Sequence, residues 1–139
     1  MFAGKKGEEN NMLRILVVED SPVNMALTVA ILEGAGHAIL QADHAVEGIE
    51  LARREQPDLV LMDIQLPDID GLAATRRLKA DPRTAHMPVI ALTAFAMKGD
   101  EDETRAAGCD GYVTKPIRYK EFLAEVNAVM KRRSRAAAG

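Results

Sequence analysis

The sequence predicts an α/β fold: a doubly wound, five-stranded parallel sheet with five helices that cover both of its faces. Short apolar runs rich in β-branched residues alternate with segments of helical periodicity along the whole chain. Apolar runs without polar alternation are typical of parallel strands that are buried on both faces. The regular alternation of the two patterns favours parallel strands joined by crossover helices.

Five apolar runs have the composition of buried strands. In chain order they cover residues 14–18, 37–41, 59–62, 88–92 and 111–113. Pro57 and Asp58 separate the third run from the helix before it, because proline disfavours helix in the residue that precedes it. The fifth run is the shortest.

Helices are expected between these runs. The first begins with Ser21 as N-cap and Pro22 as first helical residue, and Gly34 or Gly36 ends it. The apolar residues at helical spacing in this helix are Val23, Leu27, Ala30 and Ile31. The second helix is predicted over residues 45–55, and its inward residues are Val46, Ile49 and Ala52.

The remaining helices differ in their apolar anchors. A helix over residues 72–80 ends at Asp81 and Pro82. Residues 98–107 have a helical pattern with almost no large apolar side chain, which predicts one of the least stable elements. The last helix runs from Tyr119 to about Lys131 and is amphipathic. Its inner face carries Phe122, Leu123, Val126, Val129 and Met130.

The composition is that of one soluble domain. The chain has 139 residues, of which 47% are hydrophobic and 28% charged. We expect a domain over residues 12–131 between a flexible N-terminal extension, 1–11, and a flexible basic tail, 132–139. No apolar run is long enough to cross a bilayer, no secretory signal is present, and the lone Cys109 requires no oxidising compartment. These features predict a cytoplasmic protein without a membrane partner.

Charge is unevenly distributed along the chain. Lys131, Arg132, Arg133 and Arg135 carry four positive charges, and because the whole chain carries −3, the rest carries −7. An acidic body argues against direct nucleic-acid binding, which requires a basic face. The basic tail is either a solvated helix end or a contact for an acidic partner or an anionic surface.

Polar residues follow four of the predicted strands, at the edge where ligands bind in such sheets. They are Glu19 and Asp20 after the first strand, Asp63 after the third, Thr93 after the fourth, and Thr114, Lys115 and Pro116 after the fifth. Three neighbouring carboxylates repel one another unless a cation neutralises them, and oxygen ligands favour a hard cation such as Mg²⁺. Zinc is poorly supported, because Cys109 is alone and no ligand spacing connects His37, His44 and His86.

Each of these residues also has a simpler interpretation. Asp20 could cap the first helix, and Asp68 and Asp70 could serve only the turn in which they lie. Thr93 could be an ordinary strand-end hydroxyl and Lys115 a solvated charge. The occurrence of such residues at four strand ends favours a common site.

Four motifs make the chain resemble the receiver domains of two-component response regulators. They are VVED at 17–20, LVLMDIQLP at 59–67 with Asp70-Gly71, ALTA at 91–94, and GYVTKP at 111–116. The resemblance covers residues 14–130 and implies a flavodoxin-like, three-layer fold with strand order 2-1-3-4-5. The stretch TAFAMKGD at 93–100 is most similar to single-domain regulators of the DivK type, and it also occurs in receivers attached to hybrid histidine kinases.

The resemblance implies a role for each site residue. Asp63 would accept a phosphoryl group from a phosphohistidine on a histidine kinase or histidine phosphotransfer protein. The ligands of Mg²⁺ would be Glu19, Asp20, Asp63 and the backbone carbonyl of Gln65. Lys115 would pair with one phosphoryl oxygen and Thr93 would hydrogen-bond another. The Lys115–Pro116 bond is a candidate cis peptide.

The same resemblance implies a conformational output. Thr93 would move toward the phosphate, and Tyr112 would rotate inward into the space that Thr93 leaves. The switch face would consist of the fourth helix, the fifth strand and the fifth helix. Tyr112 could instead be an ordinary half-buried aromatic residue, and Phe95 is either part of the core or an anchor for a partner.

Three classes of function compete. The favoured one is a phosphoacceptor switch that is not an enzyme beyond its own phosphorylation and slow dephosphorylation. It would act on a protein target as a monomer or weak homodimer. A phosphatase or phosphotransferase acting on a small substrate would need a second aspartate two residues after Asp63, where Gln65 stands. A nucleotide-binding fold would need a glycine-rich motif after the first strand, and none is present.

Overall fold

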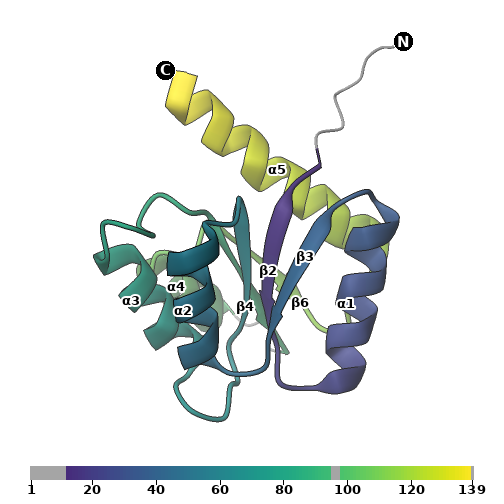
Figure 1. Ribbon diagram of the computed structural model, residues 1–139, viewed down its shortest axis with the longest axis horizontal. Coiled ribbons are helices and arrows are strands. Elements are labelled where there is room, and N and C mark those ends of the chain that lie inside the picture. The colour runs from purple at the N-terminus through teal and green to yellow at the C-terminus, as the bar shows by residue number, and fades with distance from the viewer. Residues whose placement is uncertain (1–11, 95–97, 139) are drawn as a thin grey trace.

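Five parallel strands and five helices alternate along the chain in the computed structural model, which describes residues 12–94 and 98–138. The strands are β2 (Arg14–Val18), β3 (Ala38–Ala42), β4 (Leu59–Asp63), β5 (Val89–Thr93) and β6 (Gly111–Thr114). The helices are α1 (Pro22–Gly34), α2 (Ala45–Glu55), α3 (Gly71–Ala80), α4 (Lys98–Ala106) and α5 (Tyr119–Ala138). Figure 1 shows α1 and α5 on one side of the sheet and α2, α3 and α4 on the other.

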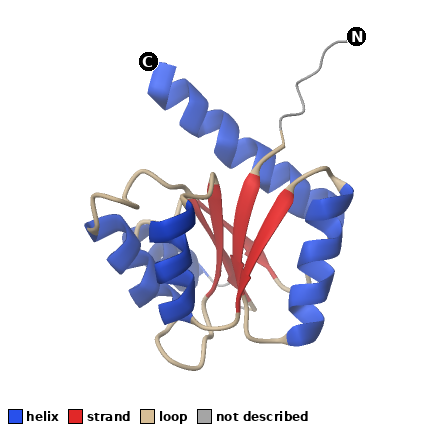
Figure 2. Ribbon diagram, in the orientation of Figure 1, coloured by secondary structure: helices blue, strands red, loops and turns tan. Residues whose placement is uncertain are grey.

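The strands form one sheet in the order β3-β2-β4-β5-β6, and every neighbouring pair is parallel. Counted along the chain, this is the order 2-1-3-4-5, so the predicted fold class and strand order are confirmed. Figure 2 shows the strands as the central layer between two layers of helices. Asp63 pairs with Leu92 and Thr93 pairs with Thr114, so the carboxyl ends of β4, β5 and β6 lie at one edge.

Two hydrophobic cores lie on the two faces of the sheet. Leu16 and Val18 of β2 face α2 and α3, whereas Ile15 and Val17 face α1 and α5. This alternation follows from the two-residue period of a strand. Every residue of β4 and β5 is buried, which explains why their sequences read as continuous apolar runs. Phe122 of α5 is fully buried in the second core.

The structure corrects two predicted helix faces. In α1 the buried residues are Met25, Thr28 and Leu32, whereas Val23 is 77% exposed and Leu27 is 43% exposed. The sequence pattern misled here because α1 is apolar almost all round, so periodicity cannot identify its inner face. In α2 Val46 is 46% exposed, while Ile49 and Ala52 are buried as predicted.

Several element ends also differ from the prediction. Strand ends shift by about one residue, because hydrogen-bond pairing rather than composition decides where a strand ends. Helix α5 continues to Ala138, past the predicted end at Lys131, so residues 132–138 are helical where a tail was expected. Alanine, arginine and lysine are strong helix formers, which accounts for the longer helix. The predicted extension 1–11 and Phe95 lie outside the described residues.

None of the helices in residues 12–94 and 98–138 is long and apolar enough to span a membrane.

Candidate functional site

Asp63 is the last residue of β4 and is only 3% exposed. Its Oδ1 accepts a hydrogen bond from the backbone N–H of Gln65 at 3.1 Å, and its Oδ2 lies 3.1 Å from Nζ of Lys115. Just beyond it, the backbone N–H of Ile64 donates to the carbonyl of Leu92 at 3.1 Å. These contacts hold the Asp63 carboxylate at the carboxyl ends of the strands, with the ammonium group of Lys115 beside it.

The predicted acidic pair lies next to Asp63. Glu19 follows β2 and is 1% exposed, and its backbone N–H donates to the carbonyl of Ala42 at 3.0 Å. Its Oε2 accepts a hydrogen bond from the N–H of Ser21 at 3.2 Å, and Asp20 between them is exposed. One carboxylate oxygen from each of Glu19, Asp20 and Asp63 lies within 4.8 Å of the other two. The fold therefore brings together the three carboxylates that the sequence analysis singled out.

Lys115 lies between two of these carboxylates. Its Nζ is 2.8 Å from Oε1 of Glu19 and 3.1 Å from Oδ2 of Asp63. Its backbone N–H donates to the carbonyl of Thr93 at 2.7 Å, which continues the pairing of β5 and β6. The Lys115–Pro116 peptide bond is cis, as the sequence indicated. The charged end of Lys115 thus reaches the site from a third strand end.

Burial and charge together perturb this cluster. Burial, and after it the adjacent Asp63, raises the pKa of Glu19 despite the opposing effect of Lys115. Burial alone would lower the pKa of Lys115, but the carboxylates of Glu19 and Asp63 outweigh it and raise that pKa. Three carboxylates and one ammonium leave an excess of two negative charges at the site. A divalent cation would neutralise this excess.

The ligand atoms available at the site fit Mg²⁺. They are carboxylate oxygens, which magnesium prefers, and the cluster contains neither a thiol nor an imidazole. Gln65 lies in the loop that follows β4, two residues beyond Asp63, and its side chain is exposed. The structure thus brings the side chains of the predicted ligand set to one place.

A second group of possible ligands lies at the start of α2. Oxygen or nitrogen atoms of Asp43, His44 and Glu47 lie within 4.8 Å of one another, although the sequence had shown no ligand spacing around His44. The Nδ1 atom of His44 is 2.7 Å from Oδ1 of Asp43, and that contact raises the pKa of His44. Asp43 and Glu47 are exposed, and groups of this kind are common on protein surfaces without a bound metal.

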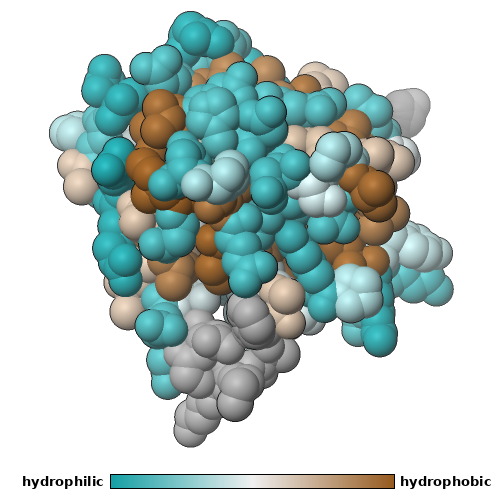
Figure 3. Space-filling view, turned by 90° about the horizontal axis from the view of Figure 1, so that it is seen from below, coloured by the Kyte–Doolittle hydropathy of each residue, from teal (hydrophilic) through white to brown (hydrophobic). Residues whose placement is uncertain are grey.

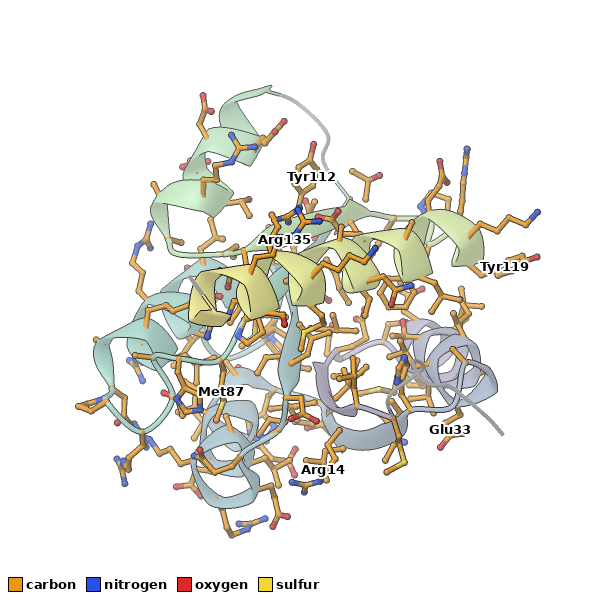
Figure 4. The ribbon with its side chains drawn as sticks, turned by 90° about the horizontal axis from the view of Figure 1, so that it is seen from above. Arg14, Glu33, Met87, Tyr112, Tyr119 and Arg135 are labelled. Atoms are coloured by element: carbon orange, nitrogen blue, oxygen red, sulfur yellow. The ribbon has the colours of Figure 1, made fainter. Side chains whose placement is uncertain are left out.

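The two predicted switch residues lie on neighbouring strands. Thr93 ends β5 and is 3% exposed, and Tyr112 of β6 is half-buried. The Tyr112 hydroxyl donates to Oε2 of Glu101 in α4 at 3.1 Å, and this hydrogen bond raises the pKa of Tyr112. Figure 4 shows Tyr112 projecting away from α5, on the side where α4 lies. In this conformation the Tyr112 side chain is therefore hydrogen-bonded to α4.

Asp68 in the loop after Asp63, and Gly71 at the start of α3, do more than the sequence indicated. A Cβ atom on Gly71 would lie 2.1 Å from the carbonyl oxygen of Asp63, so the backbone passes Asp63 at a distance that only glycine allows. Asp68, expected to serve only its own turn, accepts hydrogen bonds from the backbone N–H groups of Ala45 and Val46 in α2. Asp70 caps α3 through the N–H groups of its own helix, as a turn residue was expected to do.

Cys109 is a buried thiol away from the site, and its reactivity can be predicted. It is 8% exposed, and burial raises its pKa to about 11. At pH 8 about one thiol in a thousand would therefore be ionised in the folded protein. Because the folded pKa is raised, the stabilising contribution of the thiol is complete below the ordinary thiol pKa and is lost as pH rises toward 11.

We expect Cys109 of the native protein to react with iodoacetamide at pH 8 far more slowly than the same residue in urea-unfolded protein. Intact mass followed over time measures both rates. Similar rates in the two states would contradict the burial of this thiol.

Comparison with known proteins decides the family. The pattern described as "Response regulator receiver domain" matches residues 15–127, which is most of the chain. The chain belongs to the response regulator receiver family. Phosphorylation and Mg²⁺ binding in two-component signalling are typical of that family.

Relatives and solved structures agree with this assignment. The polar-differentiation response regulator DivK of Brucella anthropi is 43% identical over 116 residues, covering 84% of this chain and 94% of the relative, and DivK of Brucella ovis gives the same values. A receiver domain of a sensor histidine kinase from Pseudomonas aeruginosa has a TM-score of 0.78 and 32% identity, covering 89% of this chain and 99% of that chain. That structure is described with a magnesium ion coordinated in the active-site cleft. A CheY-like receiver domain protein from Methanospirillum hungatei has a TM-score of 0.82 and 27% identity, covering 91% of this chain and 99% of that chain. The predicted family and fold are thus confirmed.

Proposed function

We propose that this receiver domain is a single-domain phosphoacceptor switch in a phosphorelay, with Asp63 as the residue that accepts the phosphoryl group. The observation that carries the proposal is the arrangement around Asp63. Its buried carboxylate has Lys115 at 3.1 Å and two further carboxylates, Glu19 and Asp20, beside it. The similarity to DivK, 94% of whose length is matched, supports a regulator without a separate output domain.

In the proposed reaction an oxygen of Asp63 attacks phosphorus as the phosphorus–nitrogen bond of a phosphohistidine breaks. The imidazole leaves, and an aspartyl phosphate forms. The N–H of Gln65, bonded to Oδ1 at 3.1 Å, orients the carboxylate, while Lys115 pairs with an oxygen of the transferred group. Mg²⁺ would be held by Glu19, Asp20, Asp63 and the backbone carbonyl of Gln65. When bound, it offsets negative charge on the phosphoryl group.

The donor is proposed to be a protein, a histidine kinase or a histidine phosphotransfer protein. Helix α1 begins at Pro22, two residues after Asp20, and carries no charged residue before Glu33. Its outer face exposes Val23 and Leu27, together with Ala26 and Ala30. Figure 3, which views the molecule from below, shows apolar residues exposed among hydrophilic ones. An apolar helix face next to the site supports a donor with an apolar surface around its phosphohistidine.

The output is proposed to be a change in protein partners at the face made by α4, β6 and α5. Hollows of about 420 Å³ and about 600 Å³ lie on this face, and Tyr112 and Glu125 line both. When Thr93 bonds the phosphate, Tyr112 would leave Glu101 and turn inward, which would change the shape of both hollows. The proposed target is another protein in the cytoplasm. The receiver domain would contact it as a monomer or weak homodimer, and it would not itself bind nucleic acid or a membrane.

The test is incubation with a small phosphodonor, with and without Mg²⁺, followed by intact mass. We expect one added phosphoryl group that needs Mg²⁺, is stable in acid and is labile in base. Asp63→Asn should abolish the adduct, whereas Asp43→Asn, at an exposed aspartate, should leave it unchanged. An adduct that persists in Asp63→Asn, or an unmodified wild-type protein, would overturn the proposal.

A further inference from the structure

The loop between β4 and α3, residues 64–70, carries Gln65 past the site. Its first residue is fixed, because the N–H of Ile64 donates to the carbonyl of Leu92 at 3.1 Å. Its end is fixed to its beginning, because the N–H of Gly71 donates to the carbonyl of Ile64 at 2.7 Å. Between these ends Leu66 and Ile69 are partly buried and pack against the core. A polar contact from the same stretch would further restrict the backbone around Gln65.

Asp68 supplies a polar anchor in the middle of this loop. Its Oδ1 accepts from the N–H of Ala45 and its Oδ2 accepts from the N–H of Val46, each at 2.9 Å. Burial alone would raise the pKa of Asp68, but the backbone N–H groups outweigh it and lower that pKa to about 2. The carboxylate is therefore ionised and holds both bonds throughout the neutral pH range.

These bonds join the loop to a different element. Ala45 and Val46 are the first two residues of α2, and the side chain of the N-cap residue His44 makes no capping hydrogen bond. A helix start is ordinarily capped by the residue just before it. Here the cap comes from a loop more than twenty residues further along the chain, beside the phosphoacceptor.

Asp70 provides the local alternative in the same loop. Its Oδ1 accepts from the N–H groups of Leu72 and Ala73 at 2.9 and 3.0 Å, all within its own helix. Both aspartates thus satisfy two backbone donors at a helix start. Of these two aspartates, only Asp68 bonds the loop to another element.

From this contrast, and resting on the metal site of the proposed function, we propose that Asp68 is a positioning residue for cation binding. By tying the loop to the start of α2, it holds the backbone at Gln65 in place, so that the cation does not have to order this segment when it binds. Loss of the tie would weaken Mg²⁺ binding, as loss of a residue that supports a metal ligand commonly does.

The test compares Asp68→Ala with Asp70→Ala, since each removes a carboxylate that caps two N–H groups. Mg²⁺ dissociation constants are measured by calorimetry, and amide exchange is measured in metal-free protein. We expect Asp68→Ala to raise the dissociation constant about tenfold and to speed exchange across residues 64–69. Asp70→Ala should change the constant less than about twofold. Asp68→Asn, which keeps one acceptor oxygen, should fall between wild type and Asp68→Ala.

A dissociation constant unchanged in Asp68→Ala, or raised equally in Asp70→Ala, would mean that Asp68 is only a helix cap and would overturn the inference. Failure of the proposed function looks different. In that case wild-type protein itself would neither bind Mg²⁺ nor be modified at Asp63, whatever the variants do. Exchange across residues 64–69 in metal-free protein tests the tie independently of both.

Discussion

Replacing Lys115 with methionine is expected to lower the free energy of unfolding by about 2 kcal/mol in metal-free buffer at neutral pH, and Mg²⁺ is expected to restore most of that loss. Methionine keeps the length of the side chain but removes its charge. The Glu19 and Asp63 side chains are 1% and 4% exposed, so the variant leaves two desolvated carboxylates without their cation. The Lys115 side chain is 18% exposed, and water reaching this edge keeps the cost below that of a fully enclosed pair.

The loss should depend on pH with a definite sign. The folded-state pKa of Glu19 is already raised, and Lys115 opposes that rise. Without Lys115 the pKa should rise further. A carboxyl group with a raised folded pKa loses stability as pH increases above its ordinary value, because the unfolded chain ionises first. The difference between wild type and Lys115→Met should therefore be small below the ordinary glutamate pKa and grow toward neutral pH.

Urea denaturation with and without Mg²⁺, at acidic and neutral pH, measures these effects. Lys79→Met is the matched control, because Lys79 is likewise a partly buried lysine in an ion pair. Its partner is the carboxylate of Asp110 at 3.1 Å, away from the site. Its stability should not respond to Mg²⁺ more than that of wild type. If Mg²⁺ stabilises Lys115→Met no more than Lys79→Met, the cation does not replace Lys115 between these carboxylates.

The sheet could be predicted from the sequence because strands buried on both faces are apolar at consecutive positions, a pattern that is easily recognised. The continuous apolar runs of β4 and β5 are fully buried, and their order with the intervening helices leaves few topologies. The inner face of α1 could not be predicted, since Val23 and Leu27 are as apolar as the residues that are buried. Periodicity identifies a helix face only when the opposite face is polar.

The same distinction applies to the site. Parallel strands place their carboxyl ends at one edge, so residues that follow strands, such as Glu19, Asp63 and Lys115, can be assigned to one site from the order of the strands alone. Contacts made by loops and helix surfaces cannot be predicted from the order of the strands. The bonds from Asp68 to α2 depend on the path of a loop, and the bond between Tyr112 and Glu101 depends on the placement of α4.

Gly71→Ala is expected to be the most damaging small substitution next to the site, with a loss of about 3 kcal/mol in the free energy of unfolding. The added Cβ would lie 2.1 Å from the carbonyl oxygen of Asp63 and 2.7 Å from Cα of Ile64. Both are backbone atoms, so no side-chain rotation relieves the clash. The chain would have to move the end of β4 or the start of α3, and either movement would displace Asp63, the proposed phosphoacceptor.

Gly34→Ala is the matched control, because a Cβ at Gly34, the last residue of α1, meets no atom within 4 Å. Alanine there should be neutral or stabilise the fold by up to about 1 kcal/mol, since glycine is the poorer helix former. Urea denaturation compares the two variants, and intact mass after incubation with a phosphodonor reports on Asp63. A Gly71→Ala protein with wild-type stability and full phosphorylation would show that the backbone at Asp63 can move without loss of stability or of the proposed phosphorylation. Reduced phosphorylation under conditions where the variant is still folded would instead show that Asp63 keeps its position only when residue 71 has no side chain.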